Sequence, residues 1–192
     1  MTAYTIDLSS IIHLSCDQFD RLCESNPDVK FERTPTGELV IMPPTGGETG
    51  KKNAELITDF VLWNRQTQLG VVFDSSTCFR LPNGGDRSPD ISWVRKTRWD
   101  ALTPEEQQKF VPLCPDFVLE LRSPSDRLPP IQSKMQEYLD SGVQLGWLLN
   151  PQDKQVELYR PKHPVEILKA PSSLSGGSVL PGFIIDVNWV WR

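Results

Sequence analysis

The sequence predicts an α/β fold in which a mixed β-sheet is flanked by helices. Residues 48–69 repeat apolar side chains at helical spacing, whereas residues 116–121 and 145–149 are short, strongly apolar runs typical of buried strands. From residue 48 the predicted elements follow in the order helix, strand, strand, strand, helix, strand, which is typical of a mixed sheet with helices beside it. Because neither a linker nor a repeat is evident, we expect residues 1–192 to form a single domain.

A short helix and a hairpin are predicted before the long helix. Ser15 and Gln18 have the spacing of a capping box, which marks the start of a short amphipathic helix. Residues 29–33 and 38–42 are predicted strands, joined by a hairpin turn that contains Gly37. This hairpin is expected to be an addition to the central sheet.

The middle of the chain continues with strands and two further helices. Gly70 is expected to cap the long helix, and strands are predicted at residues 71–81 and 90–94. Thr103 is followed by a proline and by an acidic residue three positions on, which predicts the start of a short helix. Residues 131–141 are predicted to form the next long helix, because Gly142 follows as a stop signal.

Outer strands and an apolar tail complete the prediction. Residues 156–159 and 167–168 are expected to extend the sheet as a hairpin. The segment 180–191 is more apolar than a terminal tail usually is, so we expect it to dock. It would pack either on its own domain or in a two-fold homodimer, which is the commonest oligomer symmetry.

Composition excludes several classes of protein. The four cysteines are isolated, so a zinc site or a disulfide framework is not expected. The N-terminal residues do not have the pattern of a signal peptide, and no run approaches the roughly 18 apolar residues of a membrane span. A reducing, cytoplasmic setting is therefore expected.

The charge balance limits how the chain could bind DNA. A net charge of −5 argues against coating DNA by neutralising many phosphates. It remains compatible with an enzyme that contacts DNA through a local basic rim, although scattered solvated charges explain the same residues equally well. The candidates for the rim are Lys51, Lys52, Arg87, Arg95, Lys96, Arg98, Arg122 and Arg127.

Two acidic residues lie where the strand pattern favours apolar side chains. Asp90 follows Pro89 at the start of one predicted strand, and Glu120 lies inside the apolar run 116–121. A buried carboxylate is costly unless it is paired or bound to a metal ion, and a hard divalent cation would also remove the repulsion between two neighbouring carboxylates. The alternatives are an ion pair between Glu120 and Arg122 or another cation, and a turn role for Asp90.

These segments resemble a known family. SPDISWV, PDFVLELRSPSD and KMQEYLDSGVQLGWLLNP, in this order, are similar to motifs of the Uma-two family of restriction-endonuclease-like proteins, and the likeness runs from residue 19 to residue 181. The resemblance implies a PD-(D/E)XK nuclease fold: a central mixed four-stranded sheet flanked by helices, here with an added N-terminal hairpin and added C-terminal strands. It also implies Mg²⁺ or Mn²⁺ as the cofactor and DNA as the substrate.

The resemblance also implies roles for individual residues. Asp90 matches the aspartate of the PD element and Glu120 the acid of the (D/E)XK element, and both would bind the metal ion. Glu32 matches a family glutamate that would complete the acidic cluster, whereas Glu38 is a weaker candidate whose simpler explanation is a solvated strand charge.

The sequence departs from the family pattern at the motif lysine. Arg122 stands there, and a guanidinium differs from an ammonium in both geometry and acidity. Lys134, on the helix that follows, matches a family lysine and could reach back to the acidic pair; the alternative is a solvated helix lysine. If Lys134 serves, Arg122 would be a phosphate contact.

Two functions from different classes remain open on the sequence alone. The first is a metal-dependent endonuclease that hydrolyses phosphodiester bonds of DNA. The second is a catalytically weak or inactive protein that keeps the nuclease fold and binds nucleic acid or a protein partner. The arginine at the motif lysine position favours the second, whereas the buried acidic pair favours the first.

Overall fold

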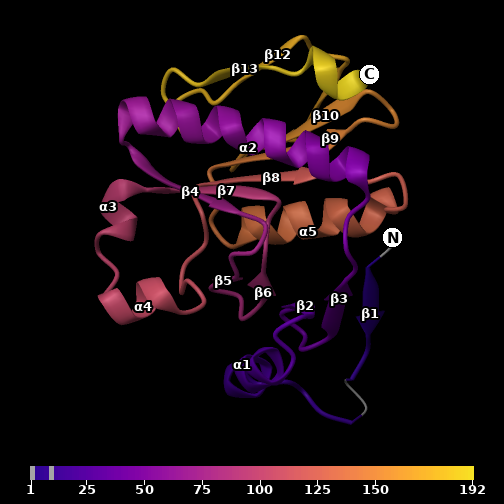
Figure 1. Ribbon diagram of the computed structural model, residues 1–192, viewed down its shortest axis with the longest axis vertical. Helices are drawn as coiled ribbons and strands as arrows, with labels where there is room; N and C mark the ends of the chain where they lie inside the picture. The colour runs from indigo at the N-terminus through magenta and orange to yellow at the C-terminus, as the bar shows by residue number, and fades with distance from the viewer. Residues whose placement is uncertain (1–2, 9–10) are drawn as a thin grey trace.

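The structure of the protein, a computed structural model, describes residues 3–8 and 11–192 (Figure 1). Its main sheet has six strands in the order β11-β10-β9-β8-β7-β4. Strands β8 and β9 are paired in parallel, and the other pairs in this sheet are antiparallel. The strands are β4 (Gly70–Asp74), β7 (Ile91–Arg95), β8 (Phe117–Leu121), β9 (Leu145–Asn150), β10 (Gln155–Tyr159) and β11 (Glu166–Lys169). The first four form the predicted mixed core, and the hairpin β10–β11 extends it beside β9.

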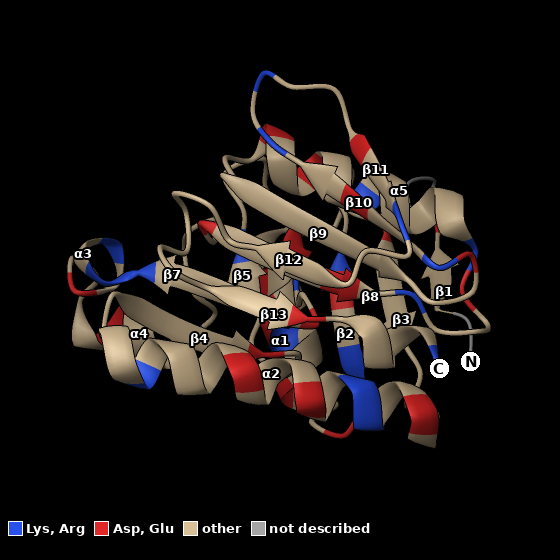
Figure 2. Cartoon of the chain, turned by 90° about the horizontal axis from the view of Figure 1, so that it is seen from above, with Lys and Arg blue, Asp and Glu red and all other residues tan. Residues whose placement is uncertain are grey.

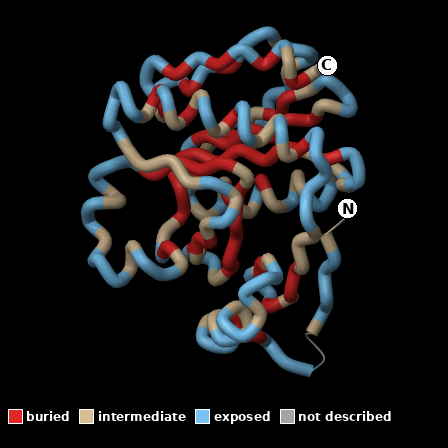
Figure 3. Tube along the Cα trace, in the orientation of Figure 1, coloured by how far each residue is buried: buried red, intermediate tan, exposed pale blue. Residues whose placement is uncertain are grey.

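One long helix covers each face of this sheet (Figure 1). Helix α2 (Gly47–Thr67) packs Leu56 and Phe60 against Phe117 of β8, and helix α5 (Leu128–Asp140) packs Met135 against Val118 on the opposite face. Successive side chains of a strand point to opposite faces, so the apolar run of β8 is buried on both sides. Figure 3 shows the resulting band of buried residues along the central strands, and Figure 2 shows charged residues of both signs recurring along α2.

The end of α2 differs from the sequence prediction. The left-handed cap is Gln68, with φ 54°, and Gly70 is already the first residue of β4. A Cβ atom at Gly70 would lie 2.3 Å from the Trp93 side chain, so this glycine is required for close packing and not for capping. The predicted strand 71–81 is also interrupted, because Ser76 donates hydrogen bonds to Asp74 Oδ1 in a turn that ends β4.

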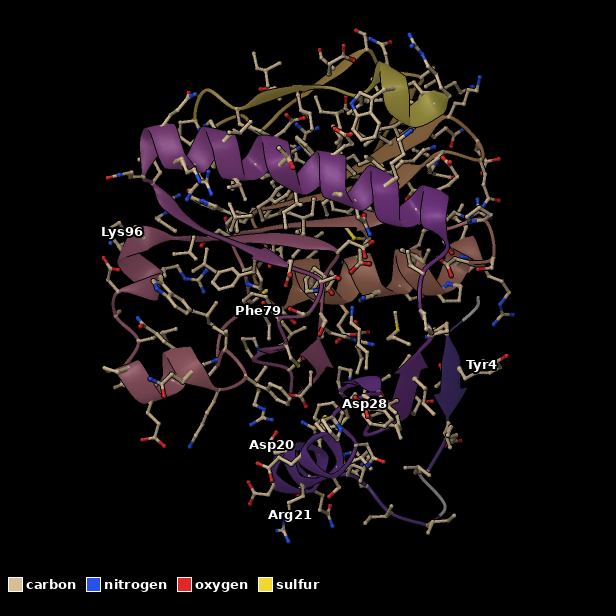
Figure 4. The ribbon with its side chains drawn as sticks, in the orientation of Figure 1. Tyr4, Asp20, Arg21, Asp28, Phe79 and Lys96 are labelled. Carbon is tan, nitrogen blue, oxygen red and sulfur yellow. The ribbon has the colours of Figure 1, made fainter. Side chains whose placement is uncertain are left out.

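The predicted N-terminal hairpin exists, but it belongs to a second sheet. This sheet has the order β1-β3-β2-β6-β5 and lies below the main sheet in Figure 1. Its strands are β1 (Tyr4–Ile6), β2 (Lys30–Arg33), β3 (Leu39–Met42), β5 (Phe79–Arg80) and β6 (Asp86–Arg87). A buried ion pair of Arg33 with Asp86 joins β2 to β6 across 53 residues of sequence, and Arg80 of β5 pairs with the same aspartate. Figure 4 shows Phe79 inside the molecule and Tyr4 at its outer edge.

The short helices and the tail complete the fold. Helix α1 (Cys16–Ser25) starts with the predicted capping box at Ser15, and α4 (Pro104–Gln108) with the one at Thr103. The remaining elements are α3 (Lys96–Trp99), β12 (Ser173–Ser175), β13 (Ile184–Asp186) and the 3-10 helix η1 (Asn188–Trp191). Phe183 and Val190 of the tail are buried in the main core beside α2. None of the helices within residues 3–8 and 11–192 is both long and apolar enough to cross a membrane.

Candidate metal-dependent active site

A cavity of about 470 Å³ lies where the N-terminal sheet meets β8 and α5. Four residues predicted from the sequence line it: Glu32 of β2, Asp90 immediately before β7, Glu120 of β8 and Lys134 of α5. They come from the two sheets and from α5, which lies between the main sheet and the N-terminal sheet in Figure 1, so the fold brings together residues that are distant in sequence.

Glu120 is buried and points toward α5 because of its position in β8. It shares its strand face with Val118, which packs against Met135 of α5. Its Oε1 atom accepts a hydrogen bond from Tyr138 Oη at 3.1 Å and lies 2.8 Å from Lys134 Nζ. Burial raises the pKa of Glu120 to about 7; the negative charge of Asp90 adds to the increase, and Lys134 opposes it.

Asp90 is held beside Glu120 by the backbone of β8. Its Oδ2 atom accepts a hydrogen bond from the Leu121 N–H at 2.8 Å, and Asn53 Nδ2 of α2 lies 3.5 Å from Oδ1. Burial raises the pKa of Asp90, although the Leu121 N–H and Lys134 partly offset this effect. Burial therefore shifts the pKa of both neighbouring carboxyl groups upward.

Glu32 has a different environment. It accepts hydrogen bonds from Lys134 at 2.8 Å, from Arg87 at 3.1 Å and from the Ser88 N–H at 3.0 Å. Burial alone would raise the pKa of Glu32, but the charges of Lys134 and Arg87 outweigh it and lower this pKa to about 2. Glu32 is thus an ionised anchor for two buried cations, placed in the cavity as the sequence predicted.

Lys134 and Arg122 lie in different places. The Lys134 ammonium contacts both Glu32 and Glu120 and is largely buried, so it is not a solvated helix lysine. The Arg122 guanidinium instead contacts the Asp126 carbonyl oxygen and the Asn150 and Asp153 side chains. Arg122 is not among the described residues that line the cavity, and no ion pair joins it to Glu120 there.

Three supporting residues were not identified from the sequence as parts of the site. Tyr138 donates to Glu120, Glu137 forms an ion pair with Arg87, and Asn53 contacts Asp90. A signal for Tyr138 was present, because it follows Lys134 by four residues and such pairs lie on one helix face. Asn53 gave no comparable signal, since its contact depends on how α2 packs on the sheet.

The oxygen donors of the site fit a hard divalent cation. Among residues 3–8 and 11–192, no group of three or more Asp, Glu, His and Cys residues is arranged to hold a metal ion, and the carboxylates of Asp90 and Glu120 are the candidate ligands. Glu120 Oε2 accepts no hydrogen bond from the described residues, and the buried Asn53 Oδ1 beside Asp90 also has no partner. Mg²⁺ is often bound by one or two carboxylates together with water and substrate phosphate.

Comparison with known proteins agrees with this arrangement. Residues 16–188 match the Uma2 family, described as "Putative restriction endonuclease". A crystal structure of "a putative nuclease belonging to DUF820 from Anabaena variabilis" is similar, with a TM-score of 0.77 and 20% sequence identity; the match covers 93% of this chain and 97% of that one. At this identity the likeness shows the shared fold. No curated protein matches the chain.

The family match covers most of the chain. It includes the acidic pair of Asp90 and Glu120 and the two further predicted residues of the cavity, Glu32 and Lys134. The main sheet, its two flanking helices and the similar nuclease structure confirm the predicted restriction-endonuclease-like fold. The chain therefore belongs to the Uma2 family of restriction-endonuclease-like proteins.

Proposed function

We propose that the protein is a metal-dependent endonuclease that hydrolyses phosphodiester bonds of DNA. The observation that carries this proposal is that one cavity brings together Asp90, Glu120 and Lys134 from three separate elements. A carboxylate pair beside a buried ammonium suits metal-dependent phosphodiester hydrolysis, because it can bind a metal ion and supply positive charge near the attacking water.

In this proposal Asp90 and Glu120 hold Mg²⁺ or Mn²⁺. The bound ion would neutralise charge on the phosphate and lower the pKa of a coordinated water. Lys134 would hold the water near Glu120, and its positive charge favours the deprotonated form of that water. Tyr138 orients Glu120, and Glu32 fixes Lys134 in place.

The raised pKa values of the acidic pair support this assignment. Burial disfavours the charged form of both Asp90 and Glu120, and the single ammonium of Lys134 is shared with Glu32. An added divalent cation would offset the remaining cost of burying the two carboxylates. A purely structural cluster would instead be expected to contain enough cations to balance its carboxylates.

The test is cleavage of DNA by the purified full chain. Plasmid, branched and single-stranded DNA would be incubated with Mg²⁺, with Mn²⁺ and with a chelator, and the Glu120→Gln variant would serve as the matched control. We expect metal-dependent cleavage that this variant lacks, with its fold verified by circular dichroism. If none of these substrates is cut with either metal, the endonuclease proposal is excluded. Metal-independent binding of DNA without cleavage would instead support the inactive, nucleic-acid-binding alternative.

A further inference from the structure

We propose that the substrate of this site is an unpaired DNA strand, with one nucleotide entering the cavity and Arg127 binding a phosphate at its mouth. This inference rests on the proposed function and specifies its substrate class. It depends on the size of the cavity, on the charges that line it and on the single lining cation that has no partner among the described residues.

The size of the cavity suits a single nucleotide. Its volume of about 470 Å³ lies within the range of pockets that hold one small molecule, roughly 300–1,000 Å³. A double helix is too wide to enter, because its major groove alone measures about 12 Å. Enzymes that modify a base within a pocket use single-stranded substrate or extrude the nucleotide, and an enclosed nuclease site would face the same geometric limit.

The N-terminal sheet is what encloses the site. Thr5 of β1, Val40 and Met42 of β3 and Glu32 of β2 line the cavity opposite Lys134 of α5. Asp90 and Glu120 therefore line a pocket with walls from both sheets, and do not lie on an open surface on which a duplex could rest. Glu120 is buried and Asp90 is half-buried at this cavity.

The charges around the cavity also argue against a duplex. Among the described residues, the acidic lining side chains Glu32, Glu38, Asp90, Glu120, Asp126 and Glu137 outnumber the basic ones, Arg87, Lys134 and Arg127. Duplex binding depends on neutralising many phosphates with Lys and Arg, which this lining does not provide. A single strand that presents one or two phosphates to the site needs far fewer cations.

Arg127 is the cation available for such a phosphate. Arg87 is engaged by Glu32 and Glu137, and Lys134 is engaged by Glu32 and Glu120. Arg127 is exposed at the start of α5 and lines the cavity, and no ion pair or hydrogen bond joins its side chain to the described part of the chain. A free guanidinium beside an acidic pocket suits a forked contact to a phosphate.

The uncharged part of the lining would receive the base. Val40, Met42 and Pro43 on one side and Pro130 and Ile131 on the other are lining residues without charge. Such a surface accepts the apolar face of any base, so we expect cleavage to depend little on the DNA sequence. Readout of a duplex sequence would require hydrogen-bonding side chains directed at base edges in a groove.

The experiment compares one labelled strand in three forms: free, fully paired with its complement, and paired so that one arm remains single-stranded. The full chain with Mg²⁺ or Mn²⁺ is expected to cut the free strand and the unpaired arm. Because unpairing costs a few kcal/mol, cleavage of the fully paired form should be at least about tenfold slower.

The role of Arg127 is tested with Arg127→Ala on the free strand. Loss of one charge-assisted contact should raise KM about tenfold and leave kcat nearly unchanged. Arg127→Lys should recover part of the loss. Arg65→Ala, which removes an exposed arginine of α2 that does not line the cavity, should match the wild-type protein.

The outcomes separate this inference from the proposed function. Equal cleavage of the paired and free strands would overturn the inference and leave the nuclease intact. An unchanged KM for Arg127→Ala would overturn the phosphate contact. Absence of cleavage of all three forms would overturn this inference, and if plasmid and branched DNA also remain uncut with either metal, the proposed function is overturned with it.

Discussion

The Nζ atom of Lys134 lies 2.8 Å from Glu120 Oε1 and also 2.8 Å from Glu32 Oε1. Glu120 belongs to the main sheet and Glu32 to the N-terminal sheet, so a single ammonium on α5 joins the two sheets at the cavity. The same atom is therefore placed both to act on substrate and to hold the fold together, and experiments on it have to separate these two roles.

Replacement of Lys134 by alanine should abolish metal-dependent cleavage. The proposed positive charge next to the attacking water would be lost, and Glu32 and Glu120 would remain buried without their shared cation. Lys134→Arg retains the charge and should preserve the fold better than it preserves the rate, because a guanidinium does not reproduce the geometry of an ammonium. Cleavage rates and urea unfolding of both variants would be measured side by side.

Lys109→Ala is the control for that experiment, because Lys109 is an exposed lysine of the α4 region and does not line the cavity. Full cleavage by a folded Lys134→Ala protein would show that the ammonium has no part in the reaction.

Replacement of Arg122 by alanine should mainly lower stability. As a candidate phosphate contact, Arg122 was expected from the sequence to affect substrate binding. Its guanidinium instead contacts Asn150, Asp153 and the Asp126 carbonyl oxygen, which connects the loop after β8 with the turn after β9. Loss of these partly exposed contacts should cost about 1–2 kcal/mol of unfolding free energy. A variant with normal stability and a raised KM would restore the phosphate-contact interpretation.

Binding of metal ions can be measured without any nuclease assay. Isothermal titration with Mn²⁺ should detect binding to the wild-type protein and a loss of at least about tenfold in affinity for Asp90→Asn or Glu120→Gln, because a carboxylate is the ligand that a hard cation prefers. Glu38→Gln is the matched control: Glu38 lines the same cavity but is occupied by hydrogen bonds from Thr34 and Thr36. Equal affinity in all four proteins would exclude the acidic pair as the metal site.

Much of the central fold could be predicted from the sequence because its signals are local. The apolar runs of β8 and β9 and the helical spacing of α2 predict their own structure. The capping boxes at Ser15 and Thr103 set helix starts through contacts within three residues. Asp90 and Glu120 could be found because a carboxylate is unusual in a buried strand.

Other features depend on packing between distant segments and have no local signal. Arg33 pairs with Asp86 across 53 residues, and this pairing gives the hairpin a sheet of its own. Gly70 was predicted to cap a helix because glycine often does so, whereas its actual requirement is the approach of Trp93. The same limit explains why Asn53 and Glu137 were missed: each reaches the site through the packing of its helix.

The docked tail can be tested through Phe183. Its ring centroid lies 4.3 Å from that of Phe60, and the residue is 3% exposed, so Phe183→Ala should cost about 3–5 kcal/mol of unfolding free energy. Ile184, the next residue, is 70% exposed, and Ile184→Ala should change the stability by less than about 0.5 kcal/mol. Urea unfolding measures both. If Phe183→Ala lowers the unfolding free energy as little as Ile184→Ala does, the tail is not part of the core.

The homodimer remains a prediction from the sequence, and Ile184 also provides a test of it. Because Phe183 and Val190 are buried within their own chain, the tail offers a dimer mainly its exposed Ile184. Sedimentation at high protein concentration would measure the oligomeric state. A dimer that Ile184→Asp dissociates would support pairing through the tail, whereas a wild-type monomer would remove this idea.

The ionised state of Glu32 should appear in the acid stability of the protein. Its pKa in the folded protein, about 2, lies below the ordinary value of 4.5, because Lys134 and Arg87 outweigh the effect of burial. A depressed carboxyl pKa contributes stability that is fully present above pH 4.5 and is lost as the pH falls toward 2. From the size of the shift, this contribution is roughly 3 kcal/mol near neutral pH and roughly 1 kcal/mol at pH 3.

Glu32→Gln keeps the shape of the side chain and removes the titration, so the difference in unfolding free energy between wild type and variant should be wide near pH 6 and should narrow at pH 3. Urea unfolding at the two pH values measures the gap, and a gap that stays constant would show that Glu32 does not titrate in this range.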